Sequence, residues 1–403
     1  LFTDASSNDY TLQSTSPAIG AGNTDATATD FNGITRPQGT ADDIGAYEYR
    51  NTWTGGSNTT DWGTPGNWDQ GYEPNANTES PIIADVANQP VISSDDGASN
   101  DGNVLLKDIT INSGAQLTIN NDSSLKLEGD FTNNSGTVIL NVESDDPVDS
   151  QNFASIIVQG TATGNITYNR FVNIADMAGA KWDLIGSPVD GLSISSFVST
   201  NTSGTATLAT NGVQYAVGVY NNSNNDWSNY TSDGTGAGDV SAAGNFDIGK
   251  GYQMGTVSGG TQLLAFTGSI ATSDQLQAII NNHDNGSGGR RFNLVANPFP
   301  SYLNLNDDAD GTNNVLSVNS SLFADPYVAV FGYDDDGTGF TGYGQDYNSN
   351  TAKYIAPGQA FMIAPTSQSS VNLSFTEAMQ TVTGGDDFIS GDPMDATEIY
   401  LFL

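Results

Sequence analysis

Aspartate-rich loops are the first candidates for chemistry in this sequence. They contain three groups of closely spaced carboxylates: Asp307, Asp308 and Asp310; Asp334, Asp335 and Asp336; and Asp386 and Asp387. Calcium prefers about six to eight oxygen ligands, which clustered carboxylates and loop carbonyls supply. No glutamate closes any of these loops in the way that an EF-hand requires. The pattern therefore predicts either calcium sites or ordinary solvated turns.

Aromatic residues beside amides form a second group of candidates. Trp227 and Tyr230 lie in NNDWSNYTSD, and Trp62 and Trp68 follow Trp53 in a stretch rich in Gly and Asn. Exposed aromatic rings stack on sugar faces while amides bond hydroxyl groups, so Trp227, Tyr230, Trp62 and Trp68 are candidate glycan contacts. Buried aromatic rings also dominate small cores. Packing is therefore the competing interpretation.

The composition removes several catalytic classes. The chain has no cysteine and a single histidine, His283, which excludes disulfides, thiol catalysis, a His-based triad and a multi-histidine metal site within it. Aspartate is plentiful enough for a glycosidase pair, but no glutamate lies in a groove-like aromatic context. Arg290 and Arg291 precede a strand, where neighbouring side chains alternate faces. We therefore expect no catalytic site.

The charge balance limits the partners. The 403 residues include 46 acidic and 10 basic side chains, which gives a formal charge of -36. Nucleic acid and anionic membrane surfaces would be repelled by such a chain. No apolar run reaches the roughly 18 residues that a membrane-spanning helix needs. We therefore expect neither kind of partner.

The elements that must position these residues are mostly short strands. Alternating runs of Val, Ile, Thr, Tyr and Phe are separated by Gly, Asn, Asp and Ser, which is typical of an all-β fold. In residues 51–169 the alternation predicts stacked rungs of a small β-solenoid or sandwich, marked by Ile109, Ile111, Leu117, Ile119, Leu125, Leu127, Val138 and Leu140. One helix is predicted at 273–283, where Leu276, Ile279 and Ile280 have near-helical spacing.

Four phrases occur twice in the same order, at offsets of about 107 to 113 residues. WDLIGSPVDG (182–191) corresponds to FNLVANPFPS (292–301), and IGKGYQMG (248–255) corresponds to IAPGQAFMIAP (355–365). The matched positions are core aromatics and turn glycines: Phe266 with Phe375, Trp227 with Phe340, Tyr230 with Tyr343, and Gly251 with Gly358. Pro188 and Pro298 each end a strand, because proline cannot donate to a ladder. The repetition predicts two β-sandwich domains joined by structural strands.

Residues 1–50 contain SPAIGAG, DFNGITRP and DIGAYEY in that order. Their alternation predicts loops followed by a short apolar strand from Ile44 to Tyr49. The three motifs resemble the closing segment of right-handed parallel β-helix proteins, which include bacterial surface proteins and some polysaccharide lyases. The resemblance implies that any catalytic groove would lie before Leu1.

A second resemblance covers residues 180–380. FNLVANPFPS followed by IAPGQAFMIAP is similar to a module near the C-terminus of exported Bacteroidetes proteins. That resemblance implies type IX secretion and display on, or release from, the surface of a Gram-negative bacterium. The sorting domain would lie beyond this sequence, so we expect an internal or processed piece of a longer polypeptide.

We therefore expect an all-β chain with five segments. They are the end of a right-handed parallel β-helix (1–50), a Trp-rich cap with a short β-solenoid or sandwich (51–169), two β-sandwich repeats (170–283 and 284–396), and the first strand of a following domain or an exchanged strand (397–403). The expected role is non-enzymatic, as a stalk, adhesin or filament component that contacts other surface proteins, copies of itself or polysaccharide. The alternatives are an accessory region of a secreted polysaccharide lyase or hydrolase, and a carbohydrate-binding module. Calcium is the only expected cofactor.

Overall fold

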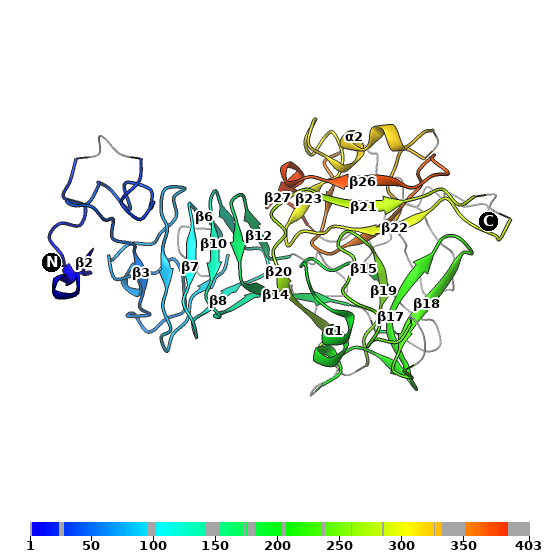
Figure 1. The fold of residues 1–403 in the computed structure, drawn as a ribbon, viewed down its shortest axis with the longest axis horizontal. Helices are drawn as coiled ribbons and strands as arrows, with labels where there is room; N and C mark the ends of the chain where they lie inside the picture. Colours follow the sequence, from blue (N-terminus) through cyan, green and yellow to red (C-terminus); the bar gives the residue numbers. More distant parts are fainter. Residues whose placement is uncertain are drawn as a thin grey trace. The chain divides into compact units, whose positions relative to one another are not determined.

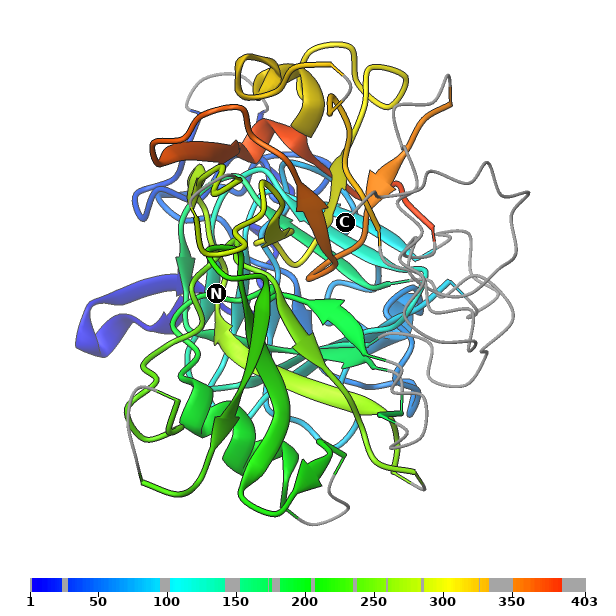
Figure 2. The ribbon, with the colours of Figure 1, turned by 90° about the vertical axis from the view of Figure 1, so that its right-hand side faces the viewer.

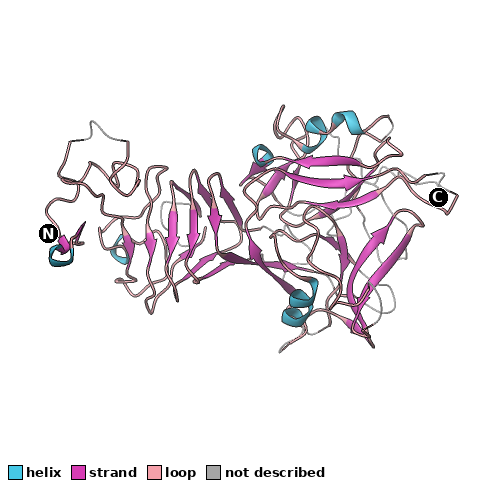
Figure 3. Cartoon of the chain, in the orientation of Figure 1, coloured by secondary structure: helices cyan, strands magenta, loops and turns pink. Residues whose placement is uncertain are grey.

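The computed structural model describes residues 2–23, 28–94, 102–141, 153–172, 174–175, 182–203, 207–234, 238–258, 260–283, 286–325, 327–332 and 351–385. Most of its regular structure is strand, which confirms the all-β class (Figure 3). None of the helices in these ranges is long and apolar enough to cross a membrane. The chain forms two compact units, one of residues 1–140 and 154–166 and one of residues 141–153 and 167–403.

Parallel strands form the body of the first unit (Figure 1). One sheet has the order β13 (Ala162–Thr163), β10 (Phe131–Asn133), β7 (Ile109–Ile111), β4 (Ile82–Ile83) and β3 (Thr52–Trp53). A second row contains β5 (Val91–Ile92), β8 (Gln116–Ile119) and β11 (Thr137–Leu140), and a third contains β6 (Asn103–Leu106), β9 (Ser124–Leu127) and β12 (Ser155–Val158). The chain visits the three rows in turn and then returns to the first. Each circuit therefore lies in register beside the preceding one.

Apolar side chains are matched between successive circuits. Leu106 pairs with Leu127, and Leu127 pairs with Val158; none of the three is more than 2% exposed. The eight apolar positions that predicted short strands here all lie in β7, β8, β9 or β11 and are buried, which confirms those strands. Because side chains in a strand alternate faces, the same spacing directs one face of each row to the core.

A polar column runs along one corner of these circuits. The Asp108 carboxylate accepts from the Ser80 hydroxyl at 2.8 Å and from the Asp130 N–H at 2.6 Å. The Asp130 carboxylate in turn accepts from the Thr161 N–H at 2.8 Å and from its hydroxyl at 2.9 Å. Each acidic side chain thus binds the backbone of the next circuit. We call Ser80, Asp108, Asp130 and Thr161 the corner column.

Residues 2–50 contain little regular structure. β1 (Phe2–Asp4) and β2 (Asp9–Leu12) form an antiparallel pair around a short 3-10 helix at Ala5–Ser7. The strand predicted from Ile44 to Tyr49 is wrong, because this stretch forms bends and irregular backbone. Ile44 is 58% exposed. Hydrogen bonds from the backbone to buried carboxylates hold the segment instead.

The second unit contains two copies of one strand arrangement. In the first copy, β15 (Asp183–Ile185) pairs antiparallel with β19 (Tyr252–Met254), and β14 (Asn165–Phe171) lies beside β20 (Leu263–Ser269). The first copy also contains β16 (Thr210–Asn211), β17 (Gln214–Asn221), β18 (Asp226–Thr231) and α1 (Ile194–Asn201). In the second copy, β22 (Asn293–Ala296) pairs antiparallel with β25 (Ala360–Ile363), and β21 (Gln275–Ile279) pairs with β26 (Val371–Phe375). The phrases that repeat in the sequence therefore form the same strand pair twice.

The helix predicted at 273–283 is wrong. β21 is a strand that pairs residue by residue with β26, from Gln275 opposite Phe375 to Ile279 opposite Val371. Leu276 is 58% exposed, whereas Ile279 is 1% exposed, so the apolar residues that suggested helical spacing do not share one buried face. β21 belongs with the second copy, where it corresponds to β14 in the first.

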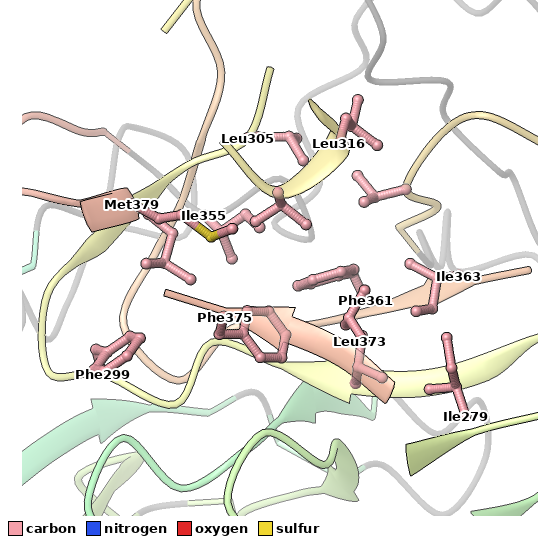
Figure 4. Close-up of a cluster of buried hydrophobic side chains, with 14 of the residues drawn as sticks. Ile279, Phe299, Leu305, Leu316, Ile355, Phe361, Ile363, Leu373, Phe375 and Met379 are labelled. Carbon is pink, nitrogen blue, oxygen red and sulfur yellow. The ribbon is translucent and has the colours of Figure 1, made fainter. Parts of the chain in front are cut away.

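Each copy has a buried aromatic cluster of its own and, within the described residues, one short α-helix. In the second copy, Phe299, Phe361, Phe375 and Met379 belong to the same buried cluster as Ile279 (Figure 4). The second copy also contains α2 (Val315–Val318), β23 (Tyr302–Asn304), β24 (Tyr354–Ile355), β27 (Gln380–Thr381) and 3-10 helices at Ser320–Leu322 and Glu377–Met379. Figures 1 and 2 show α1 and α2 at opposite sides of the second unit.

Candidate functional site

The repeated phrase makes the same turn in both copies. The Val189 N–H donates to the Ser187 hydroxyl oxygen, and the Phe299 N–H donates to the Asn297 side-chain oxygen at 3.0 Å. In each copy a short polar side chain thus caps the proline turn from two residues upstream, as in Asx and ST turns. The buried Asn297 amide also donates to the Ser301 carbonyl at 2.7 Å. These residues end a strand, and these hydrogen bonds all join their side chains to neighbouring backbone groups.

The two copies then bond to each other reciprocally. The Gly186 N–H donates to the Gly358 carbonyl at 2.8 Å, and the Ala296 N–H donates to the Gly249 carbonyl at 2.9 Å. Two antiparallel β-bridges also join the copies, one between Ile185 and Gln359 and one between Val295 and Lys250. Ile185 is equivalent to Val295, and Gln359 to Lys250. Gly186 corresponds to Ala296, and Gly249 to Gly358, so each contact is made twice. We call this contact the joint.

The strand pairing at the joint corrects one of the residue correspondences that were predicted between the two repeats. β19 and β25 align Gly249 with Gly358, and both have positive φ, 80° and 67°. The match of Gly251 with Gly358 is therefore wrong, and Gly251 corresponds to Ala360. Glycine is favoured where φ is positive because it lacks a Cβ.

Small residues let the strands approach at the joint. A Cβ on Gly186 would lie 2.2 Å from the Ala296 Cβ and 2.8 Å from the Lys250 carbonyl oxygen. A Cβ on Gly251 would lie 2.8 Å from the Ala360 Cβ. Larger side chains would separate the copies, so residue size matters here more than polarity.

A matched asparagine pair was missed by the sequence reasoning. The Asn201 amide donates to the Phe197 and Ala265 carbonyls at 2.9 and 3.1 Å, and its oxygen accepts from the Ala265 N–H at 2.8 Å. Asn319 makes the same three bonds to Val315 and Ser374. Asn201 is the last residue of α1 and Asn319 directly follows α2. An asparagine at the end of a short helix is the sequence signal that could have identified them.

Buried carboxylates in the first unit also serve the backbone. Glu48 accepts from the Gln38 and Asp43 N–H groups at 2.9 and 2.8 Å and pairs with Arg36 at 2.9 Å. Asp43 accepts from the Gly20 and Tyr49 N–H groups. Burial raises the pKa of both carboxyls, against the lowering effect of these hydrogen bonds. Their bonding explains the DFNGITRP and DIGAYEY motifs as loop bracing.

The tryptophans of the first unit are core residues. Trp62 and Trp68 are 1% and 2% exposed, and their ring centroids lie 4.7 Å apart. The Trp62 indole N–H donates to the Pro74 carbonyl at 3.1 Å, and that of Trp68 donates to the Trp62 carbonyl at 2.9 Å. With their rings enclosed, Trp62 and Trp68 offer no face to a sugar, so the glycan interpretation of these two residues is corrected to packing.

Trp227 and Tyr230 lie on β18 and are both half-buried. They are three residues apart, so they project from opposite faces of the strand and do not form one platform. Trp227 packs on Tyr220 with a centroid distance of 5.0 Å. Burial raises the pKa of Tyr230 to about 12, with a further contribution from Asp247.

The first aspartate loop is braced internally. Asp307 accepts from the Asn314 amide at 3.0 Å and from the Ser317 hydroxyl, and Asp310 accepts from the Thr312 and Asn313 N–H groups at 2.9 Å. Hydrogen bonding lowers the pKa of Asp307 and Asp310, and Asp308 is exposed. The described ranges hold no group of three His, Cys, Asp or Glu suited to a metal ion. Asp334, Asp335, Asp336, Asp386 and Asp387 lie outside the described residues. Calcium binding stays a prediction.

Comparison of the sequence with known protein families places the chain in one of them. A family described as a domain of unknown function (DUF8693) matches residues 52–396. No curated protein and no solved structure matches the sequence. The family match covers the stacked circuits, both copies and the joint, and the chain therefore belongs to the family DUF8693.

Proposed function

We propose that this chain is a non-enzymatic structural segment of an extracellular bacterial surface protein, acting as a stalk, adhesin or filament component. The observation that supports the proposal is that buried and partly buried polar side chains form hydrogen bonds to the backbone of neighbouring strands and circuits. Asp108 and Asp130 bind the backbone of neighbouring circuits, and Asn201 and Asn319 clasp a strand in each copy. Polar groups engaged in this way brace a chain and are poorly placed for chemistry.

A finer fold belongs to the same proposal. The in-register parallel rows support a short β-solenoid for residues 51–169, and the antiparallel pairs around a buried cluster support a sandwich for each copy. In a solenoid each circuit contacts mainly its neighbours, so stability is shared along the stack. Residues 1–50 would be the closing segment of a preceding right-handed β-helix, as their motifs suggest.

Single-molecule pulling of the full chain between reference domains tests a load-bearing role. We expect discrete, reproducible unfolding events, because the circuits and copies are closed by many backbone hydrogen bonds. Smooth extension at low force would contradict a stalk. Protease treatment of intact cells that make the protein tests surface display, for which release of peptides from residues 52–396 is expected.

An accessory role in a polysaccharide-degrading enzyme is the competing proposal. The full chain should release no reducing ends and no unsaturated sugars from a panel of polysaccharides, because buried carboxylates such as Glu48 and Asp43 are occupied by backbone N–H groups. Turnover by the purified chain would refute the non-enzymatic role.

A further inference from the structure

We propose that the second unit binds an anionic polysaccharide, a chain of carboxylated or sulfated sugars, on an aromatic and arginine surface beside the joint. The surface consists of six half-buried residues: Tyr220, Trp227, Arg290, Arg291, Phe292 and Tyr327. The binding proposal is independent of the structural role, and either can fail without the other.

Contacts across the two copies make this surface continuous. Tyr220 and Trp227 pack, with Met362, against the buried cluster of Leu184, Leu294, Ala296 and Ala360. Met362 exchanges two backbone hydrogen bonds with Phe331 at 2.8 and 2.9 Å, and the Phe331 ring lies 5.4 Å from that of Phe292. The Phe292 ring is 6.2 Å from Tyr327. Tyr220 and Trp227 of the first copy therefore lie on a cluster that Met362 connects, through Phe331, to Phe292 and Tyr327 of the second copy.

The hairpin of β17 and β18 is fixed to the second copy at this surface. The Arg290 N–H donates to the Asn222 carbonyl at 2.8 Å, and the Asn222 amide donates to the Asn293 side-chain oxygen at 3.2 Å. The Asn282 amide donates to the Asn222 side-chain oxygen at 2.7 Å. Binding would thus meet a preorganised surface, which limits the entropy lost on association.

Two arginines on this surface indicate that its ligand is an anion. The Arg291 guanidinium lies 4.2 Å from the Tyr327 ring centroid. Burial raises the pKa of Tyr220, against the lowering effect of the nearby Arg290. In the described part of the chain, neither arginine forms an ion pair, and the buried Arg290 Nε has no hydrogen-bond partner. The whole chain has only 10 basic side chains against 46 acidic ones. Arg290 Nη1 donates to the Gly288 carbonyl at 2.9 Å, so the other terminal N–H groups of Arg290 and the Arg291 guanidinium are the donors that an external anion would meet.

The aromatic component favours a sugar over an acidic peptide. Arginine pairs with carboxylate or sulfate through parallel hydrogen bonds, while aromatic rings stack on the C–H faces of a sugar. The Asn225 side-chain oxygen accepts from the Tyr220 hydroxyl at 2.9 Å, which places an amide group suited to sugar hydroxyls beside this ring. The many acidic side chains elsewhere in the chain repel any polyanion. Binding should therefore depend on charges near the ligand, in salt that screens interactions between charges more than about 8 Å apart.

Calorimetric titration of the full chain at about 0.15 M salt tests the proposal. The probes are polygalacturonate, the same polymer fully methyl-esterified, and polyglutamate. We expect binding of polygalacturonate, with at least roughly tenfold weaker binding of the ester and of polyglutamate, since a hydrogen bond to a charged group is worth about that factor. Absence of polygalacturonate binding, or equal binding of the ester or of polyglutamate, would overturn the proposal.

Variants of the full chain assign the surface. Arg290→Gln with Arg291→Gln should weaken binding about 100-fold, roughly tenfold for each arginine. Lys126→Gln with Lys353→Gln removes the same charge from residues outside this surface and should leave affinity within about twofold. Arg290→Lys with Arg291→Lys keeps the charge and should retain part of the affinity. Near-UV circular dichroism checks that each variant is folded. Equal losses in the arginine and lysine variants would refute this site.

Discussion

Substituting Gly186 with alanine should open the joint. The added Cβ would lie 2.2 Å from the Ala296 Cβ and 2.8 Å from the Lys250 carbonyl oxygen. The second of these atoms is backbone and cannot move without moving its strand. Overpacking of this kind costs about 1–3 kcal/mol, and the two close contacts place Gly186→Ala near the upper value, about 3 kcal/mol.

The reciprocal substitution makes the prediction specific. Ala296→Gly alone should cost about 1.5 kcal/mol, from a lost buried methyl and greater backbone freedom. In the double variant Gly186→Ala with Ala296→Gly, the Cβ–Cβ clash disappears and only the Lys250 contact remains. We expect a total cost of about 2.5 kcal/mol, some 2 kcal/mol below the sum of the single variants, within the range for contacting residues.

Hydrogen exchange measured by mass spectrometry reports this opening locally. The Gly186 and Ala296 amides donate across the joint, so a 3 kcal/mol loss should speed their exchange by about 100-fold. A peptide containing β8 should be unchanged. Gly238→Ala is the matched control, because no atom lies within 4 Å of the added Cβ. Additivity of the two substitutions within about 0.5 kcal/mol would refute the reciprocal contact.

Three further outcomes follow from the bonding. Asn201→Ala and Asn319→Ala should each lower the free energy of unfolding by about 2–4 kcal/mol, because each leaves buried backbone groups without a partner; equilibrium urea unfolding measures this, and a change below about 0.5 kcal/mol would count against the clasp. Asp130→Ala should cost about 1–2 kcal/mol and increase exchange at the Thr161 amide, whereas unchanged exchange there would argue against the corner column. Burial raises the pKa of the Glu79 carboxyl, so the folded unit binds this proton more tightly than the unfolded chain. Its contribution to stability should be complete below the unfolded value of about 4.3 and be lost as pH rises through the raised folded value. The melting temperature of Glu79→Gln should therefore vary less between pH 4 and 7 than that of the wild type, and an identical profile would contradict the assignment.

Local alternation predicted the strands well where one face is buried. Ile109 and Ile111, or Leu125 and Leu127, alternate with polar residues because each circuit has a core face and an outer face. The same reasoning failed at β21, where Leu276 is exposed on a two-stranded sheet and Ile280 lies beyond the strand. A short run with three apolar residues fits either period. Only its partner β26 decides between them.

Residues that act through the backbone were harder to anticipate. Nothing in the types of Asn201 or Asn319 distinguishes a buried clasp from a surface turn, since asparagine favours both local backbone bonds and loops. The tryptophan stretch posed a similar problem. Its Gly- and Asn-rich surroundings suggested exposed loops, yet those loops wrap Trp62 and Trp68 and accept their indole N–H groups. Burial of a side chain depends on distant segments that local sequence does not specify.

The joint explains why the repeated phrases kept some residues and changed others. A reciprocal contact places each strand both inside its own copy and against the equivalent strand of the other, as in an isologous interface. Gly186 and Ala296 meet face to face, so one of them can carry a methyl group only if the other does not, and the same holds for Gly251 and Ala360. The turn glycines Gly249 and Gly358 are identical, because both need positive φ. A requirement on backbone conformation thus selects the same residue type in both copies. A limit on side-chain volume restricts only the sum of the two facing residues, so their types can differ between the copies.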